Sequence, residues 1–197
     1  MQAGENIVYR NFKESVRYLK KIKRHFWISL VLFFGFGLFG FIFPVFFVEQ
    51  VRQMIEEIIK QTAGLSTLGL IRFIIFNNVK SAFFGLIFGL FFAIIPLGIL
   101  IINGYVLGFV ASKSASSEGL LILWRLLPHG ILEIPAVLIS VALGIRLGTF
   151  LFIYQGKNKW KEFKKWIWDS LKVFLFIVIP LLVIAGIIEG VLIGVVG

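Results

Sequence analysis

A histidine and a glutamate four residues apart have types and a spacing that could do chemistry. His129 and Glu133 lie near two prolines, Pro128 and Pro135, in otherwise apolar sequence. Ionisable side chains cost free energy to place in such surroundings, so they usually mark a functional or structural site. At a spacing of four, the two side chains share one face of a helix that begins by His129.

Three kinds of site are compatible with this pair. A metal site needs a third ligand, which Glu189 supplies only if the fourth and fifth spans are adjacent. Intramembrane hydrolysis needs a nucleophile or an activated water, and the sequence has no Ser-His or Asp pair at a telling spacing. The third kind is a hydrogen-bonded network that locks a broken helix into a bundle. The sequence favours this network, with no catalytic residue, metal or cofactor. Its expected members are Asn77, Asn78, Asn103, His129, Glu133 and Glu189.

The composition indicates that these residues lie in a membrane. The chain has 197 residues, of which 59% are hydrophobic, whereas soluble domains are about 45–50% apolar. Its first apolar run, residues 26–48, is long enough to cross a hydrocarbon core of about 30 Å. The run is too long for the apolar region of a signal peptide, so we expect it to remain as an anchor. The absence of cysteine excludes disulfides, thiolate metal sites and cysteine nucleophiles.

The net charge of +10 is explained by membrane topology. Basic residues lie beside apolar segments and no nucleic-acid motif accompanies them, so we expect membrane lipids, and no nucleic acid, as their partner. Residues 1–25 and 157–171 are both rich in lysine, which places both segments in the cytoplasm. An even number of crossings must separate them. The apolar region 79–112 must therefore supply two spans, with a break near Pro96.

The predicted fold is an all-α membrane protein, a single domain with about five transmembrane helices. A re-entrant or half-length helix precedes the fourth span, and amphipathic helices lie on the surface. The segments are a basic amphipathic helix (1–25), the first span (26–48), outer surface helices (49–76), the second span (79–96), the third span (97–112), the half helix (119–128), the fourth span (131–155), a basic aromatic interfacial helix (157–171) and the fifth span (173–195). The N-terminus is expected in the cytoplasm and the C-terminus outside.

Some details of these spans depend on single residues. The amides of Asn77 and Asn78 favour a helix cap, so the second span is expected to begin there. Two full crossings need about 40 residues, so either one helix is short or residues 68–76 add length. Pro180 predicts a kink in the last span. Arg146 lies about three and a half turns nearer the cytoplasm than Glu133 and needs a partner of its own, or a path to the interface.

Glycines at a spacing of four lie on the last four spans. Lipid tails give helices no hydrophobic drive to associate, so close approach through small residues provides the contact. We expect these glycines to pack the helices of one bundle, with a homodimer through one groove as the alternative. The residues are Gly85, Gly89, Gly104, Gly108, Gly144, Gly148, Gly186, Gly190 and Gly194.

Several of these motifs together resemble the stage II sporulation protein M family. The resemblance is clearest over residues 71–148, and it is carried by Phe76-Asn77-Asn78, the glycine-rich span with Pro96, Asn103-Gly104-x-x-x-Gly108 and Leu127-Pro128-His129-Gly130-x-x-Glu133-x-Pro135. The resemblance implies an integral membrane protein of about five spans. The sporulation member of the family is a scaffold for cell-wall-degrading partners, which implies protein partners and no intrinsic catalysis.

These observations predict a non-enzymatic scaffold or assembly subunit of a complex in the cell membrane, because packing motifs are many and reactive residues few. A transporter or channel component, permease-like with an intramembrane polar site, is the alternative. The breaks expected near Pro96 and Pro128 support it, as do the charged groups within the bilayer. An intramembrane metal-dependent hydrolase is the third interpretation.

Overall fold

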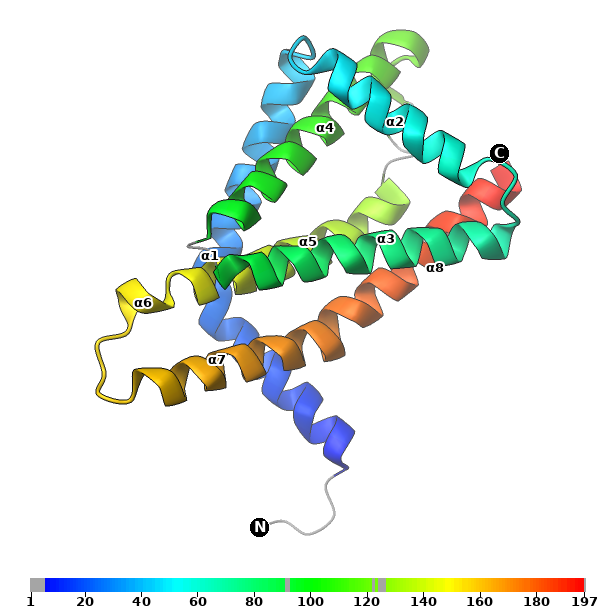
Figure 1. Cartoon of the computed structure of the whole chain (residues 1–197). Helices are drawn as coiled ribbons and strands as arrows, with labels where there is room; N and C mark the ends of the chain where they lie inside the picture. The colour runs from blue at the N-terminus through cyan, green and yellow to red at the C-terminus, as the bar shows by residue number, and fades with distance from the viewer. Residues whose placement is uncertain (1–5, 91–92, 122, 124–126, 197) are drawn as a thin grey trace.

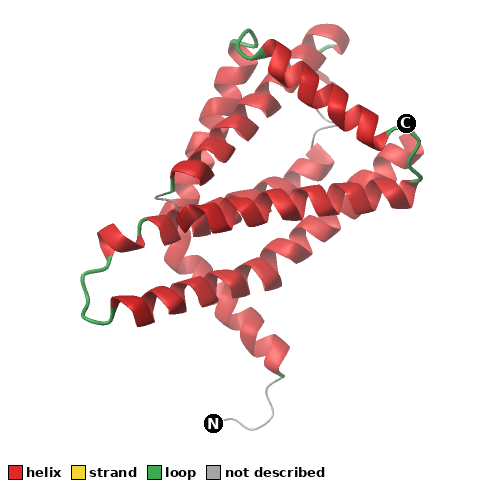
Figure 2. Ribbon diagram, viewed as in Figure 1, coloured by secondary structure: helices red, strands yellow, loops and turns green. Residues whose placement is uncertain are grey.

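The computed structural model describes residues 6–90, 93–121, 123 and 127–196, and these are helical almost throughout, with no strand among them (Figures 1 and 2). Five helices in this part of the chain are long and apolar enough to cross a membrane, which confirms the predicted class. In chain order the elements are α1 (Ile7–Ile42), α2 (Val48–Thr62), α3 (Thr67–Ile87), the 3₁₀ turn η1 (Phe88–Leu90), α4 (Ile94–Glu118), α5 (Leu127–Gly148), α6 (Phe150–Ile153), α7 (Lys159–Val173), the π-helical turn η3 (Phe174–Val178) and α8 (Ile179–Val196).

Helix α1 joins two segments that the sequence analysis separated. The basic stretch expected to end at residue 25 continues without a break into the first span, because no glycine or proline interrupts residues 7–34. Its basic half packs on α7, where Lys172 Nζ lies 2.6 Å from Glu14 Oε2. The Tyr18 hydroxyl donates to the Trp166 carbonyl oxygen, 3.4 Å away. The helix ends at Ile42, shortly before Pro44, and not at residue 48 as expected.

The second span begins earlier than predicted. Helix α3 runs through Asn77 and Asn78, and its cap is Ser66, whose hydroxyl accepts from the Gly69 N–H at 3.2 Å. Residues 68–76 therefore add the length that two crossings need. The break that follows lies at η1 and Ala93, which has φ +63°, and so precedes Pro96. Pro96 falls in the first turn of α4, where a missing N–H costs little.

The fourth span begins earlier than the expected residue 131, because α5 begins at Leu127 and includes Pro128 in its first turn. This helix ends at Gly148, so the fourth span is displaced toward the N-terminus relative to the expected 131–155. Residues 122 and 124–126 of the half helix expected at 119–128 lie outside the described residues.

The predicted interfacial helix and the last span form one continuous helix in the structure. Helix α7 passes through the π-helical turn Phe174–Val178 into α8, close to the kink predicted at Pro180. A proline has no N–H to pair with the carbonyl one turn earlier, and a π-helical turn adjusts the helix at such a point.

Two groups of helices meet in the fold. Helix α3 packs against α8 and α5, and α1 packs most extensively against α4. Figure 1 shows α1 and α4 leaning away from α3, α5 and α8, while α2 crosses from the end of α1 to the start of α3. Buried side chains of α1, α3, α5 and α8 make the main core, among them Ile22, Leu86, Leu143 and Leu182.

Glycines lie where the helices approach most closely. On α5, a Cβ at Gly144 would overlap the backbone of Gly85 on α3, and one at Gly148 would overlap that of Gly89. The same holds between α4 and α1, where Gly104 faces Phe33 and Gly108 faces Gly37. On α8, Gly186, Gly190 and Gly194 face Ile75, Ile71 and Thr67 of α3. Each of the four glycine grooves is thus in contact with another helix of the same chain.

The turn between α1 and α2 is fastened by one phenol. Tyr105 Oη donates to the Phe46 carbonyl at 2.7 Å and accepts from the Phe46 N–H at 3.1 Å.

Tyr105→Phe leaves both backbone groups of this partly buried turn without their partner, which should cost about 1–3 kcal/mol. We expect a lower thermal midpoint and faster amide exchange at residues 45–48. Tyr9→Phe, on an exposed ring, is the control, and equal behaviour of the two variants would contradict the prediction.

Candidate functional site

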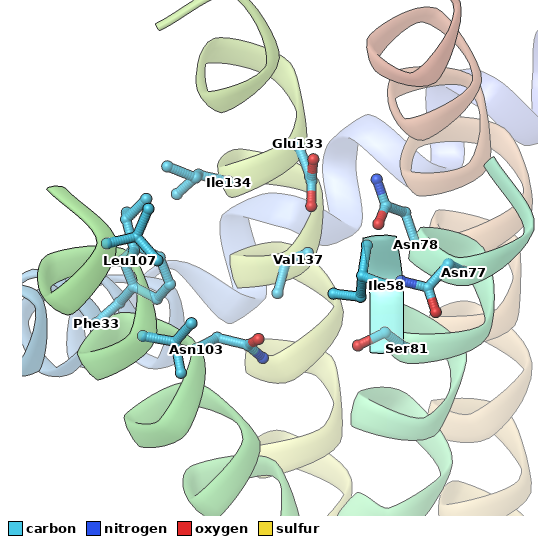
Figure 3. Close-up of a pocket in the computed structure, with 12 residues that line it drawn as sticks. Phe33, Ile58, Asn77, Asn78, Ser81, Asn103, Leu107, Glu133, Ile134 and Val137 are labelled. Atoms are coloured by element: carbon cyan, nitrogen blue, oxygen red, sulfur yellow. The ribbon is translucent and has the colours of Figure 1, made fainter. Parts of the chain in front are cut away.

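A cavity of about 370 Å³ lies between the two groups of helices and gathers most of the predicted polar cluster (Figure 3). Asn77 and Asn78 reach it from α3, Asn103 from α4 and Glu133 from α5. Ser81 adds a hydroxyl. The remaining lining residues are apolar: Phe33, Ile58, Val106, Leu107, Val110, Ile134 and Val137.

The depth of the cavity follows from the corrected start of α3. The sequence analysis placed Asn77 and Asn78 at the outer end of the second span, whereas they lie at the middle of the helix Thr67–Ile87. Asn103 likewise lies well inside α4, which spans Ile94–Glu118. The amides therefore line the cavity within the apolar length of the bundle and not at its rim.

The acidic side of the cavity is formed by Glu133. Figure 3 shows its carboxylate and the Asn78 side chain pointing toward each other, and Asn78 is its hydrogen-bond partner. Glu189 on α8 lies close enough for its charge to act on Glu133, although it does not line the cavity. Two carboxyl groups from neighbouring helices thus belong to the same polar region.

The amides and the hydroxyl leave the cavity able to bind solutes. Asn103 Nδ2 donates to the carbonyl oxygen of Ile99 in its own helix at 2.9 Å, so its amide oxygen is the acceptor that remains for a ligand. Asn77, Asn78 and Ser81 can donate or accept. The described lining holds no basic side chain, and its ionisable residue is the acid Glu133, so the site suits a polar neutral molecule or a cation.

His129 lies on α5 one turn before Glu133, but its side chain is outside the described part of the structure. Its expected membership of the cluster stays a prediction. Among the described residues, no group of three His, Asp or Glu side chains is arranged to hold a metal ion.

Sequence reasoning missed Ser81 and the apolar wall. A signal for Ser81 was present, because it lies three and four residues after the two asparagines and so shares their helix face. Ile58 could not have been found, since it belongs to the surface helix α2, which only the folded chain brings over the cavity.

This arrangement defines the class of protein: a polytopic α-helical membrane protein with a polar cavity inside its bundle. The comparisons with known proteins then give the family. The model of the family described as Stage II sporulation protein M matches residues 29–192, and the chain belongs to this family.

Two relatives come from Methanocaldococcus jannaschii. The uncharacterized protein MJ0706 is 30% identical over 172 residues, which cover 84% of this chain and 76% of the relative. The uncharacterized protein MJ0793 is 38% identical over 119 residues, which cover 59% of this chain and 66% of the relative. No solved structure matches the chain.

Proposed function

We propose that this protein is a non-enzymatic membrane subunit that binds a small polar or cationic solute inside the bilayer, as a permease-like component of a membrane complex. The observation that carries the proposal is the cavity of about 370 Å³ with three asparagines, a serine and a glutamate in its wall. Its volume lies within the range of small-molecule sites, about 300–1,000 Å³. Polar groups at this depth recur where substrates cross membranes.

The surrounding helices support passage as well as binding. The bend between α3 and α4 is made by a 3₁₀ turn and a left-handed Ala93, so backbone irregularity lies between the two helices that supply the amides. Helix α4 and the second half of α1 diverge from α3 (Figure 1), and α1, α3, α4 and α5 all contribute residues to the cavity wall.

Transport measurements on the purified full chain test this proposal. In liposomes, we expect uptake of at least one small cation from a panel of potassium, ammonium and ethanolamine above that of protein-free vesicles. Asn103→Leu, which puts an apolar side chain into the cavity wall, should abolish the uptake. Ile102→Leu, on the exposed neighbouring position, should retain it. A chain that neither moves nor binds any member of the panel contradicts the proposal.

A scaffold that assembles protein partners is the second candidate, and the surface of α2 favours it. On this helix Val51 is the buried residue, while Met54 and Ile59 are exposed. Arg52 Nη2 lies 2.9 Å from Glu49 Oε1, and this hydrogen bond holds the pKa of Glu49 below its ordinary value. The helix therefore carries fixed charges of both signs beside apolar side chains, a composition suited to a protein partner.

Co-purification tests the scaffold. A tagged chain isolated from native membranes should bring a stoichiometric partner, and Arg52→Glu should release it. Isolation without any partner would count against assembly as the function, and it would leave the transport measurement unaffected.

The orientation in the membrane is a further prediction. Lysines of α1 and α7 should hold the N-terminus and residue 158 in the cytoplasm, where their positive charges also meet anionic lipid. A reporter at residue 115, near the end of α4, should lie outside, as should the C-terminus. Accessibility labelling of single cysteines at residues 115 and 158 measures this, and labelling of both from one side would refute the orientation.

A further inference from the structure

A second polar site lies at the opposite end of α5 from Glu133. Arg146 is only 8% exposed. Its guanidinium carbon lies 4.2 Å from the ring centroid of Trp166 on α7 and 4.8 Å from that of Tyr18 on α1. The cation is therefore held between two aromatic faces from two other helices, which fixes the plane of the guanidinium group.

Stacking leaves the hydrogen bonds of this guanidinium unused. Its N–H groups point within the plane of the group, away from the ring faces. Among the described residues, Nε and Nη1 are buried and have no hydrogen-bond partner. Asp169 on α7 acts on Arg146 through its charge, but no carboxylate of the described chain forms an ion pair with it. A buried cation with unused donors is costly unless a partner joins it.

In the described part of the chain, His25 adds a second polar side chain without a hydrogen-bond partner at the same end of the bundle. It lies on α1, two turns after Tyr18, and it is near enough for the charge of Arg146 to act on it. Its Nδ1 is also buried without a hydrogen-bond partner in the described structure. Lysines of α1 and α7 surround the region, and the Lys21 Nζ lies 5.6 Å from the Tyr18 ring centroid. The field around the site therefore attracts anions.

We propose that Arg146, with His25 beside it, binds a phosphate group at the end of the bundle where α1, α5 and α7 meet. The guanidinium fork presents parallel N–H donors at the spacing of phosphate oxygens, which a lysine cannot do. The phosphate comes either from an anionic lipid headgroup or from a soluble phosphate compound. This site is separate from the solute cavity, and it does not depend on transport.

Thermal unfolding of the full chain in neutral detergent tests the site. One arm adds sodium phosphate against sodium chloride at equal ionic strength, and the other adds phosphatidylglycerol against phosphatidylcholine in mixed micelles. We expect a rise of roughly 3 °C or more in the midpoint near saturation. A response to inorganic phosphate identifies a soluble ligand, and a response to the anionic lipid alone identifies a headgroup. No response beyond the controls in either arm overturns the proposal.

Two substitutions separate binding from structure. Arg146→Gln should remove the phosphate response, while Arg72→Gln, on an exposed arginine of α3, should keep it. If Arg146 only stabilises the aromatic stack, Arg146→Gln will lower the midpoint without changing the phosphate response. That result overturns the proposal. If Arg146→Gln does not fold, Arg146→Lys keeps the charge and loses the fork. At least threefold weaker binding is then expected, and unchanged affinity overturns the assignment.

Discussion

Gly144→Ala should destabilise this protein strongly, whereas Gly98→Ala should leave it intact or slightly more stable. A Cβ at Gly144 would overlap the backbone oxygen of Gly85, and a backbone atom cannot rotate away as a side chain does. Helices α3 and α5 would have to separate, and overpacking of this kind costs about 1–3 kcal/mol or more. At Gly98 no atom lies within 4 Å of the added carbon.

The comparison isolates the helix contact because both positions are helical. Alanine gains about 1 kcal/mol of helix propensity over glycine at either site, so a loss at Gly144 alone reports the interface. Unfolding of the two purified variants in detergent, followed by circular dichroism with increasing denaturant, measures the difference. Equal stability would mean that α3 and α5 do not touch at this glycine. Gly35→Ala on α1, where no atom lies within 4 Å, is a second control.

Glu133→Gln should weaken the binding of a small cation by about 10- to 100-fold, because charge-assisted contacts contribute about 1.5–3 kcal/mol. The glutamine has nearly the same shape and can still hydrogen-bond with Asn78. The fold should therefore survive, and the thermal midpoint without ligand should change little. Binding is measured by isothermal titration, and uptake by the liposome experiment.

A control on the surface makes this result specific. Glu57→Gln removes a carboxylate from the exposed face of α2 and should leave binding unchanged. If Glu133→Gln binds the cation as well as the unmodified chain, the carboxylate is no part of a solute site. If Glu133→Gln instead lowers the stability and its folded fraction transports normally, the polar cluster holds the bundle together. The scaffold then becomes the better proposal.

The cavity changes the interpretation of the His129–Glu133 stretch. From the sequence, Glu133 belonged to a network that locks a broken helix, and in the structure it lies in the second turn of α5, which begins at Leu127. The polar groups of α3, α4 and α5 still come together, but they line a cavity. A space bounded by amides and a carboxylate can take a ligand, and on this ground we propose the permease-like function.

The sequence by itself determined the membrane class, the five candidate spans and four of the polar residues that line the cavity: Asn77, Asn78, Asn103 and Glu133. Span length and hydrophobicity follow from the thickness of the bilayer, so they can be read from a single chain. Polar residues in apolar runs can also be recognised in the sequence. The free-energy cost of placing a polar side chain in the membrane does not depend on which helix it faces. The exact helix ends were less certain, since Ser66 and Asn77 are both good caps and only packing selects between them.

Only the tertiary structure decided which of these residues meet. Whether Asn78 reaches Glu133, and whether Glu189 comes near, depends on which helices are neighbours, and the close glycine contacts between α3, α5 and α8 fix this. The stacking of Arg146 between Tyr18 and Trp166 likewise joins three helices far apart in the sequence. Distances between helices arise from packing across the bundle. The periodicity of residues along a single helix does not predict them.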